Sequence, residues 1–260
     1  MATRYARRLS QDDVEIWYDG VWHHRSGQIA FADGSRFQYF RDEFRRWSHQ
    51  AERCVAASTD YWYHAGAPLP GETVVDVGAG RGEDLLAFCE SVGPTGRVIA
   101  IEAHPETFRL LQRFRELNSL AIVVPVHAAA LDYEGTAHIG NCADWQDNSI
   151  GDGGDFAVPA RTLDDICRVV APGPVGLLKM NIEGSEASAL QGATGLLART
   201  QLVAVACHDF RADRHDGERF RTRAHVQRLL EASGFAVTSR SQDPRVGIQD
   251  HVFGKRALPD

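Results

Sequence analysis

A glycine-rich segment after a short apolar run is the first part of the sequence that could do chemistry. The run at residues 73–77 leads directly into Gly78, Gly80 and Gly82. Glycines at such a bend let the backbone turn sharply and approach a ligand, and the next helix presents unpaired N–H groups. A dinucleotide fingerprint would place a third glycine at position 83, but this chain has Glu83 there. Because acids in the first helical turn repel a pyrophosphate, the loop favours a phosphate-free, partly cationic ligand.

Polar side chains at the ends of other apolar runs form a second group of candidates. Glu102 ends the next predicted strand, where an acid can accept hydrogen bonds from ribose hydroxyls. Lys179, Asn181 and Glu183 alternate along a later strand and therefore share one face of it. Ligands bind at the carboxyl ends of such strands, so we expect Asn181 and Glu183 to reach the site while Lys179 lies deeper. The structural alternative for Lys179 is mutual neutralisation with a carboxylate.

The elements that must position these residues alternate between strands and helices after residue 71. Strands are predicted at residues 73–77, 98–102, 121–129, 175–182, 202–207, 235–240 and 251–255, and helices at 83–92, 106–118, from 185, and at 219–232. This alternation predicts an α/β fold with a doubly wound, mostly parallel sheet and helices on both faces. The Gly- and Asp-rich segment 140–156 interrupts it, and loops of that length usually have a function.

The N-terminal third has a different pattern. Two Asp-Gly dipeptides, Asp19-Gly20 and Asp33-Gly34, stand between alternating apolar segments and predict hairpin turns. Helical spacing follows over residues 41–64, and a Pro- and Gly-rich stretch at 68–71 marks a boundary. We therefore predict a β-hairpin and helical cap at residues 1–68 and the main domain at 69–260.

Composition and charge exclude several classes of protein. The chain has 260 residues and a formal net charge of −7, which disfavours a protein that neutralises nucleic-acid phosphates. Its five cysteines are far apart and show no CxxC spacing, so we expect no disulfide framework and a reducing cytoplasm. No apolar stretch approaches the roughly 20 residues of a membrane span. The two lysines, Lys179 and Lys255, are not preceded by tyrosine at the fourth position, which argues against a short-chain dehydrogenase.

Several motifs together resemble the FkbM family of class I S-adenosylmethionine-dependent methyltransferases. The resemblance covers roughly residues 70–240. It is carried by the segments Asp76-Val-Gly-Ala-Gly-Arg-Gly, Ile101-Glu-Ala-His-Pro, Arg161-Thr-Leu-Asp-Asp, Leu177-Leu-Lys-Met-Asn-Ile-Glu-Gly-Ser-Glu and Cys207-His208. The family usually has Asp where this chain has Asn181, which removes a charge from that position.

The resemblance implies a cofactor, an acceptor and roles for individual residues. The cofactor is S-adenosyl-L-methionine, and its site is formed by Asp76, Gly78, Ala79 and Gly80 at the methionine, Glu102 at the ribose, Ala103 and Ala129 at the adenine, and Asn181 nearby. The acceptor is a hydroxyl of a small molecule or oligosaccharide, a sugar or glycoside in preference to a polyketide or other natural product.

His208 is the expected general base for this reaction. An attacking hydroxyl must lose its proton, and histidine titrates near working pH. Glu183 or Asp209 would orient the base or the acceptor. A divalent cation such as Mg²⁺, held by Asn181, Glu183, Asp209 and acids of residues 147–155, is the alternative means of activation.

Two rival functions remain at this stage. A nicotinamide-dependent oxidoreductase is the rival enzyme of the same architecture. A non-catalytic cofactor-binding module, forming a homodimer through the cap, is the rival of another class. We expect neither a membrane nor a nucleic acid among the partners of this protein.

Overall fold

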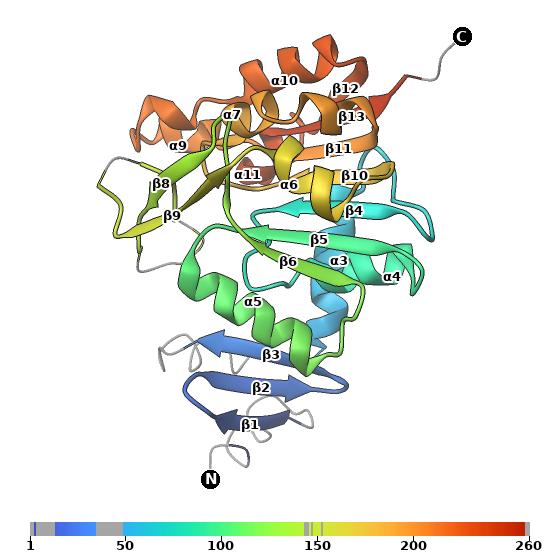
Figure 1. Cartoon of the computed structure of the whole chain (residues 1–260), viewed down its shortest axis with the longest axis vertical. Coiled ribbons are helices and arrows are strands. Elements are labelled where there is room, and N and C mark those ends of the chain that lie inside the picture. Colours follow the sequence, from blue (N-terminus) through green and yellow to red (C-terminus); the bar gives the residue numbers. More distant parts are fainter. Residues whose placement is uncertain are drawn as a thin grey trace.

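The computed structural model of the chain describes residues 3, 14–34, 49–142, 146, 148–151 and 153–257. Its centre is a seven-stranded sheet in the order β12-β13-β11-β10-β4-β5-β6 (Figure 1). The strands are β4 Thr73–Val77, β5 Arg97–Glu102, β6 Val123–His127, β10 Val175–Met180, β11 Thr200–Ala206, β12 Phe235–Ser239 and β13 His251–Arg256. β13 runs antiparallel to both of its neighbours, and the other pairs are parallel. The predicted doubly wound, mostly parallel sheet is confirmed.

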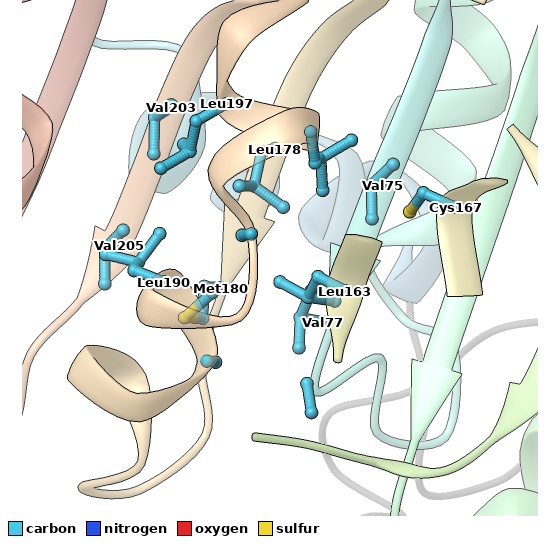
Figure 2. Close-up of a cluster of buried hydrophobic side chains, with 14 of the residues drawn as sticks. Val75, Val77, Leu163, Cys167, Leu178, Met180, Leu190, Leu197, Val203 and Val205 are labelled. Atoms are coloured by element: carbon cyan, nitrogen blue, oxygen red, sulfur yellow. The ribbon is translucent and has the colours of Figure 1, made fainter. Parts of the chain in front are cut away.

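Alternate side chains of the central strands feed two separate cores, as the period of two requires. One core joins Val75 and Leu178 to the helices α6 Leu163–Val170, α7 Glu186–Gln191, α8 Thr194–Ala198 and α10 Arg223–Ala232. Figure 2 shows its buried side chains, including Leu163 and Val203. The other core joins Val74 and Leu177 to α3 Gln50–Trp62, α4 Leu85–Val92 and α5 Pro105–Leu117. Both faces of the sheet are therefore covered.

A three-stranded antiparallel sheet lies at the N-terminal end of the molecule (Figure 1). Its strands are β1 Val14–Tyr18, β2 Trp22–Ser26 and β3 Ile29–Gly34. The predicted turn at Asp19-Gly20 is confirmed, and a further turn at Gly27 joins β2 to β3. The second Asp-Gly pair ends β3, and the strand predicted beyond it lies outside the described residues. The helix predicted over residues 41–64 is present as α3, and residues 41–48 also lie outside the described ranges.

Asn118, at the end of α5, attaches this sheet to the main domain. Its Oδ1 accepts a hydrogen bond from the backbone N of Ala30 at 2.8 Å, and its Nδ2 donates to the Ala30 carbonyl at 2.7 Å. Phe31 and Trp62 belong to the same buried cluster as α4 and α5. The division into residues 1–68 and 69–260 stays a prediction, because the two parts share this core.

The segment after β6 departs from the predicted order of elements. The strand expected over residues 121–129 ends at His127, and the chain then enters a small separate sheet in the order β7-β9-β8. Its strands are β7 Ala129–Ala130, β8 Gly135–Ile139 and β9 Phe156–Arg161. The remaining elements are α9 Asp209–Asp213, η3 Glu218–Phe220 and α11 Val246–Gln249. None of the helices within the described ranges is long and apolar enough to cross a membrane.

Candidate functional site

A cavity of about 770 Å³ opens at the carboxyl ends of the parallel strands, the place where such sheets bind ligands. Nine of the predicted site residues line it: Gly78, Ala79, Gly80, Glu102, Ala103, Ala129, Asn181, Glu183 and His208. Two others, Asp76 and Asp209, do not line it. The strand ends therefore bring most of the predicted residues to one place.

Gly78 is required by the turn between β4 and α4. Its φ of +76° is unfavourable for residues with a side chain, and an added Cβ would lie 1.9 Å from the carbonyl oxygen of Asn181. The backbone N of Gly78 also donates to the Ile101 carbonyl at 2.9 Å. The turn therefore packs between the ends of β5 and β10, and these contacts fix the position of its backbone at the cavity.

Gly78→Ala is expected to lower the free energy of unfolding by about 2 kcal/mol or more beyond the loss in Gly27→Ala. Both variants strain the backbone, but only the alanine at position 78 also collides with a neighbouring atom. Gly27 has a comparable φ of +60° and nothing within 4 Å of its added Cβ. Urea unfolding of the two variants measures the difference. Equal losses would show that the close approach to Asn181 is not a constraint.

Glu102 lies at the end of β5 with its carboxylate against the glycine turn. Its Oε2 accepts from the backbone N of Gly80 at 3.0 Å and its Oε1 from that of His104 at 2.8 Å. Burial raises the pKa of Glu102 to about 7, although these hydrogen bonds work in the opposite direction. Each carboxylate oxygen has two lone pairs, so both can accept a further hydrogen bond from a ligand.

Asp76 does not reach the cavity, in contrast to its predicted contact with a ligand. It is wholly buried and pairs with Lys179 at 2.7 Å between Nζ and Oδ1. Burial raises the pKa of Asp76 to about 6, and Lys179 works against that rise. Burial also works to lower the pKa of Lys179, but the charges of Asp76 and Asp84 outweigh it and hold that pKa above its ordinary value. The predicted neutralisation of Lys179 by a carboxylate is confirmed.

Lys179 connects this ion pair to the surrounding elements. Its ammonium donates to the Gly78 carbonyl at 2.9 Å and lies 3.3 Å from Asp84 Oδ2, at the start of α4. It also lies 4.9 Å from the ring centre of Trp62, the last residue of α3. One buried cation therefore holds the glycine turn, α4 and α3 together.

His208 lies between two carboxylates. Its Nε2 is 2.8 Å from Glu183 Oε1, and its Nδ1 is 2.9 Å from Glu186 Oε1. Burial works to lower the pKa of His208, but the hydrogen bonds and charges of both glutamates outweigh it and raise the pKa to about 9. The imidazole is therefore protonated at neutral pH, with both nitrogens engaged. This arrangement conflicts with the prediction that His208 accepts a proton.

Glu183 faces the cavity from a strained backbone position. Its φ is +49°, which is uncommon for a residue with a side chain, and Gly184 follows with a φ of +96°. Its second oxygen, Oε2, accepts from Arg211 at 2.7 Å. Burial works to raise the pKa of Glu183, but His208 and Arg211 outweigh it and hold the pKa below its ordinary value. The sharp bend after β10 thus places an ionised carboxylate in the cavity wall.

Asp209 has a different role from the predicted one. Its Oδ1 accepts hydrogen bonds from the backbone N of Thr222 at 2.9 Å and of Arg223 at 3.0 Å. These groups lie at the start of α10, where backbone N–H groups have no partner within the helix. Asp209 therefore caps α10 and does not line the cavity.

The charge of His208 gives a pH-dependent contribution to stability. Because its pKa in the folded state, about 9, exceeds the unfolded value of about 6.5, this contribution is complete below pH 6.5 and is lost as the pH rises through 9. The difference in unfolding free energy between the natural protein and His208→Gln is expected to shrink by roughly 2–3 kcal/mol between pH 6 and pH 10. Urea unfolding at both pH values measures it. A difference independent of pH would contradict the ion-paired imidazolium.

The predicted magnesium ligands that lie among the described residues are not brought together. Asp209 faces α10, and Glu183 is held by His208 and Arg211. Over the ranges that the structure describes, no group of three or more His, Cys, Asp or Glu side chains is arranged to hold a metal. Asp147, another predicted ligand, lies outside those ranges. The Mg²⁺ prediction therefore has no support from the structure.

Aromatic side chains form another part of the cavity wall, and His251 is a member of it that the sequence pattern did not indicate. The rings of Trp62 and His251 stack with centroids 5.3 Å apart and an angle of 7° between their planes, and Tyr61 lies beside them. Burial lowers the pKa of His251 to about 4, so this histidine is neutral. His251 begins an antiparallel strand, which places it beside Ala206 at the site edge. An antiparallel direction for this last strand would have indicated from the sequence that His251, its first residue, lies at the ligand-binding edge of the sheet.

Comparison with protein families gives one match that spans most of the main domain. A family model described as the methyltransferase FkbM domain matches residues 76–236. Two curated proteins match short segments. The catalytic subunit of a tRNA (adenine(58)-N(1))-methyltransferase, TRM61 from Yarrowia lipolytica, is 29% identical over 79 residues, which cover 30% of this chain and 20% of that protein. An arsenite methyltransferase from Halobacterium salinarum is 48% identical over 40 residues, which cover 15% of this chain and 10% of that protein.

Solved structures resemble the chain at low sequence identity. An FkbM methyltransferase from Methylobacillus flagellatus has a TM-score of 0.48 and 17% identity, covering 83% of this chain and 60% of that one. A fibrillarin from Aeropyrum pernix with natively bound S-adenosyl-L-methionine has a TM-score of 0.48 and 14% identity, covering 79% and 76%. The chain thus spans only a minor part of the two curated relatives and over half of these structures.

Proposed function

Since the chain belongs to the FkbM methyltransferase family and is an S-adenosylmethionine-dependent methyltransferase, we propose that it methylates a hydroxyl group of a sugar or glycoside. One observation carries this proposal: the ionised carboxylate of Glu183 lines the same cavity as the glycine turn and Glu102. A carboxylate in that position can accept the hydrogen of a hydroxyl that reacts beside the cofactor.

The residues around the glycine turn fit the cofactor. Glu102 has free lone pairs for the two ribose hydroxyls, and Ala103 and Ala129 leave room for a flat base. Acidic residues at the start of α4 suit a ligand that carries positive charge and no phosphate. Gly78, Ala79 and Gly80 would border the methionine part, with Asn181 close by. Asp76 would act from beneath the turn, through Lys179.

Glu183 rather than His208 is the proton acceptor in this proposal. The cofactor supplies a methyl group carried on a sulfonium, and the acceptor oxygen attacks that carbon as the carbon–sulfur bond breaks. As the new carbon–oxygen bond forms, the hydroxyl proton becomes strongly acidic, so even a weakly basic carboxylate can take it. His208 and Arg211 keep Glu183 ionised and oriented. His208 is thus a positioning residue.

The polar character of the cavity wall supports a sugar over a polyketide acceptor. Gln146, Asn148, Ser149 and Asn181 line it and offer neutral hydrogen-bonding groups. A largely apolar acceptor could not pair with them, and it would leave the buried Nδ2 of Asn148, which has no hydrogen-bond partner among the described residues, unsatisfied at a cost in binding free energy. Asn148 and Ser149 come from the segment whose length and composition indicated a functional loop.

A radiolabelled methyl-transfer screen tests the proposed function. Glycosides are expected to gain label from S-adenosylmethionine at higher rates than polyketide hydroxyls of similar size. Calorimetry on the same protein should give binding of S-adenosylhomocysteine and none of NAD. Cofactor binding without transfer to any hydroxyl would favour the non-catalytic module, and preferential labelling of polyketides would overturn the sugar assignment.

A further inference from the structure

Among the described residues, each Lys and Arg side chain that lines the cavity forms an ion pair with a carboxylate, except Arg214. Arg211 is paired with Glu183 and Asp216, and Arg245 with Asp60 and Asp243. Lys179 is held by its buried acids. Arg214 also lines the cavity, yet no carboxylate of the described residues lies within 4.0 Å of its guanidinium. The acids nearest to it in sequence are engaged elsewhere, since Asp213 pairs with Arg221 and Asp216 with Arg211.

Arg214 is held beside the reacting groups by an aromatic ring. Its guanidinium lies over Phe210, with Cζ 5.2 Å from the ring centre. The other neighbour of Phe210 is His208, whose ring centre is 5.9 Å away. Asp250 fixes the backbone at this point by accepting from the Phe210 N at 2.8 Å. Phe210 therefore contacts both the guanidinium, which has no carboxylate partner among the described residues, and the imidazole that pairs with Glu183.

We propose that Arg214 recognises an anionic group on the acceptor, a carboxylate or a phosphate, while a hydroxyl of the same sugar residue contacts Glu183. This inference rests on the proposed function and specifies its substrate class. A guanidinium forms short, charge-assisted hydrogen bonds to carboxylate and phosphate, and its planar fork matches both. Because Arg214 and His208 both neighbour Phe210 and all three line the cavity with Glu183, a single sugar ring that carries the hydroxyl and the anionic group at different positions suits this arrangement. Uronic acid glycosides and sugar phosphates have this chemistry.

Steady-state kinetics with three matched acceptors tests this inference. The acceptors are methyl glucoside, methyl glucuronide and methyl glucoside 6-phosphate. At least one anionic acceptor is expected to have a KM about tenfold lower than the neutral one, with a smaller change in kcat. The two anionic acceptors distinguish a carboxylate from a phosphate. Added salt should reduce the preference, because Arg214 is exposed to solvent.

Three variants assign the preference to one side chain. Arg214→Ala is expected to remove the tenfold difference by raising KM for the anionic acceptor alone, and Arg214→Lys to restore part of it. Arg228→Ala is the matched control, because Arg228 is an exposed arginine of α10 that does not line the cavity. It removes the same charge and should leave the preference intact.

The kinetic results distinguish a failure of anion recognition by Arg214 from a failure of hydroxyl methylation. Equal KM values for neutral and anionic acceptors, unchanged in Arg214→Ala, would overturn the inference and leave hydroxyl methylation standing. If none of the acceptors is methylated, the proposed function fails for them. Calorimetry then tests Arg214 separately, by measuring the binding of methyl glucuronide and of methyl glucoside 6-phosphate to the protein loaded with S-adenosylhomocysteine. Binding of either that is weakened in Arg214→Ala would support it, and no difference between the two proteins would refute it.

Discussion

Replacing Glu183 by glutamine is expected to lower kcat by about 10²–10⁴-fold, while affinity for S-adenosylhomocysteine changes by less than about threefold. Glutamine keeps the size of the side chain, but its single amide oxygen can accept from only one of the two donors, His208 and Arg211, and its amide cannot accept the hydroxyl proton. Glu102 contacts the glycine turn, whereas Glu183 contacts His208 and Arg211, so cofactor binding is not expected to depend on the charge of Glu183. Initial rates and calorimetry measure the two quantities.

Glu231→Gln is the control for this substitution. Glu231 is an exposed residue of α10 outside the cavity wall, so its variant should retain the natural rate. A Glu183→Gln protein with natural turnover would eliminate Glu183 as proton acceptor. A parallel loss of cofactor affinity would instead mean that Glu183 contributes to the cofactor site.

Lys179→Met is expected to lower the free energy of unfolding by about 3–5 kcal/mol, because it leaves the buried carboxylate of Asp76 without its cation. Methionine fills much of the volume of lysine, so the lost free energy of unfolding is due to the missing charge rather than to poorer packing. The deficit should narrow at mildly acidic pH, where Asp76 can take up a proton instead of remaining a buried, unpaired charge. Urea unfolding at pH 7.5 and pH 5.5 measures both effects.

Lys255 provides the matched control, because it is the other lysine of the chain and is exposed. Lys255→Met should change stability by no more than about 0.5 kcal/mol. The double variant Asp76→Asn, Lys179→Met removes both charges and should recover a large part of the loss. A Lys179→Met protein as stable as Lys255→Met would contradict the buried ion pair.

The parallel sheet and its ligand-binding edge could be predicted because both follow from local patterns. Alternating apolar runs and helical segments define the topology, and parallel strands end at one edge. Glu102, Asn181 and Glu183 reach the cavity for that reason. Asp76 does not line the cavity, because its side chain pairs with Lys179 on the neighbouring strand.

The protonation state of His208 and the residues that form the rest of the cavity wall could not be predicted from the strand pattern. The pKa of His208 depends on Glu186. The chain bends at Glu183 and Gly184, which have positive φ angles, and this bend brings the Glu186 carboxylate within hydrogen-bonding distance of the imidazole. Asp209 follows His208 directly, yet the first turn of α9 directs it to the start of α10. Trp62 enters the cavity wall from a helix far away in sequence, and such packing follows from tertiary contacts alone.

The most direct test of the account is the chemical identity of the methylated atom. The protein is incubated with S-adenosylmethionine labelled with ¹³C in its methyl group and with the acceptor of lowest KM, and the product is examined by carbon NMR. A single new O-methyl signal on one sugar hydroxyl is expected, and it should be absent in the Glu183→Gln sample. Label on nitrogen, carbon or a carboxylate oxygen of the acceptor would contradict it.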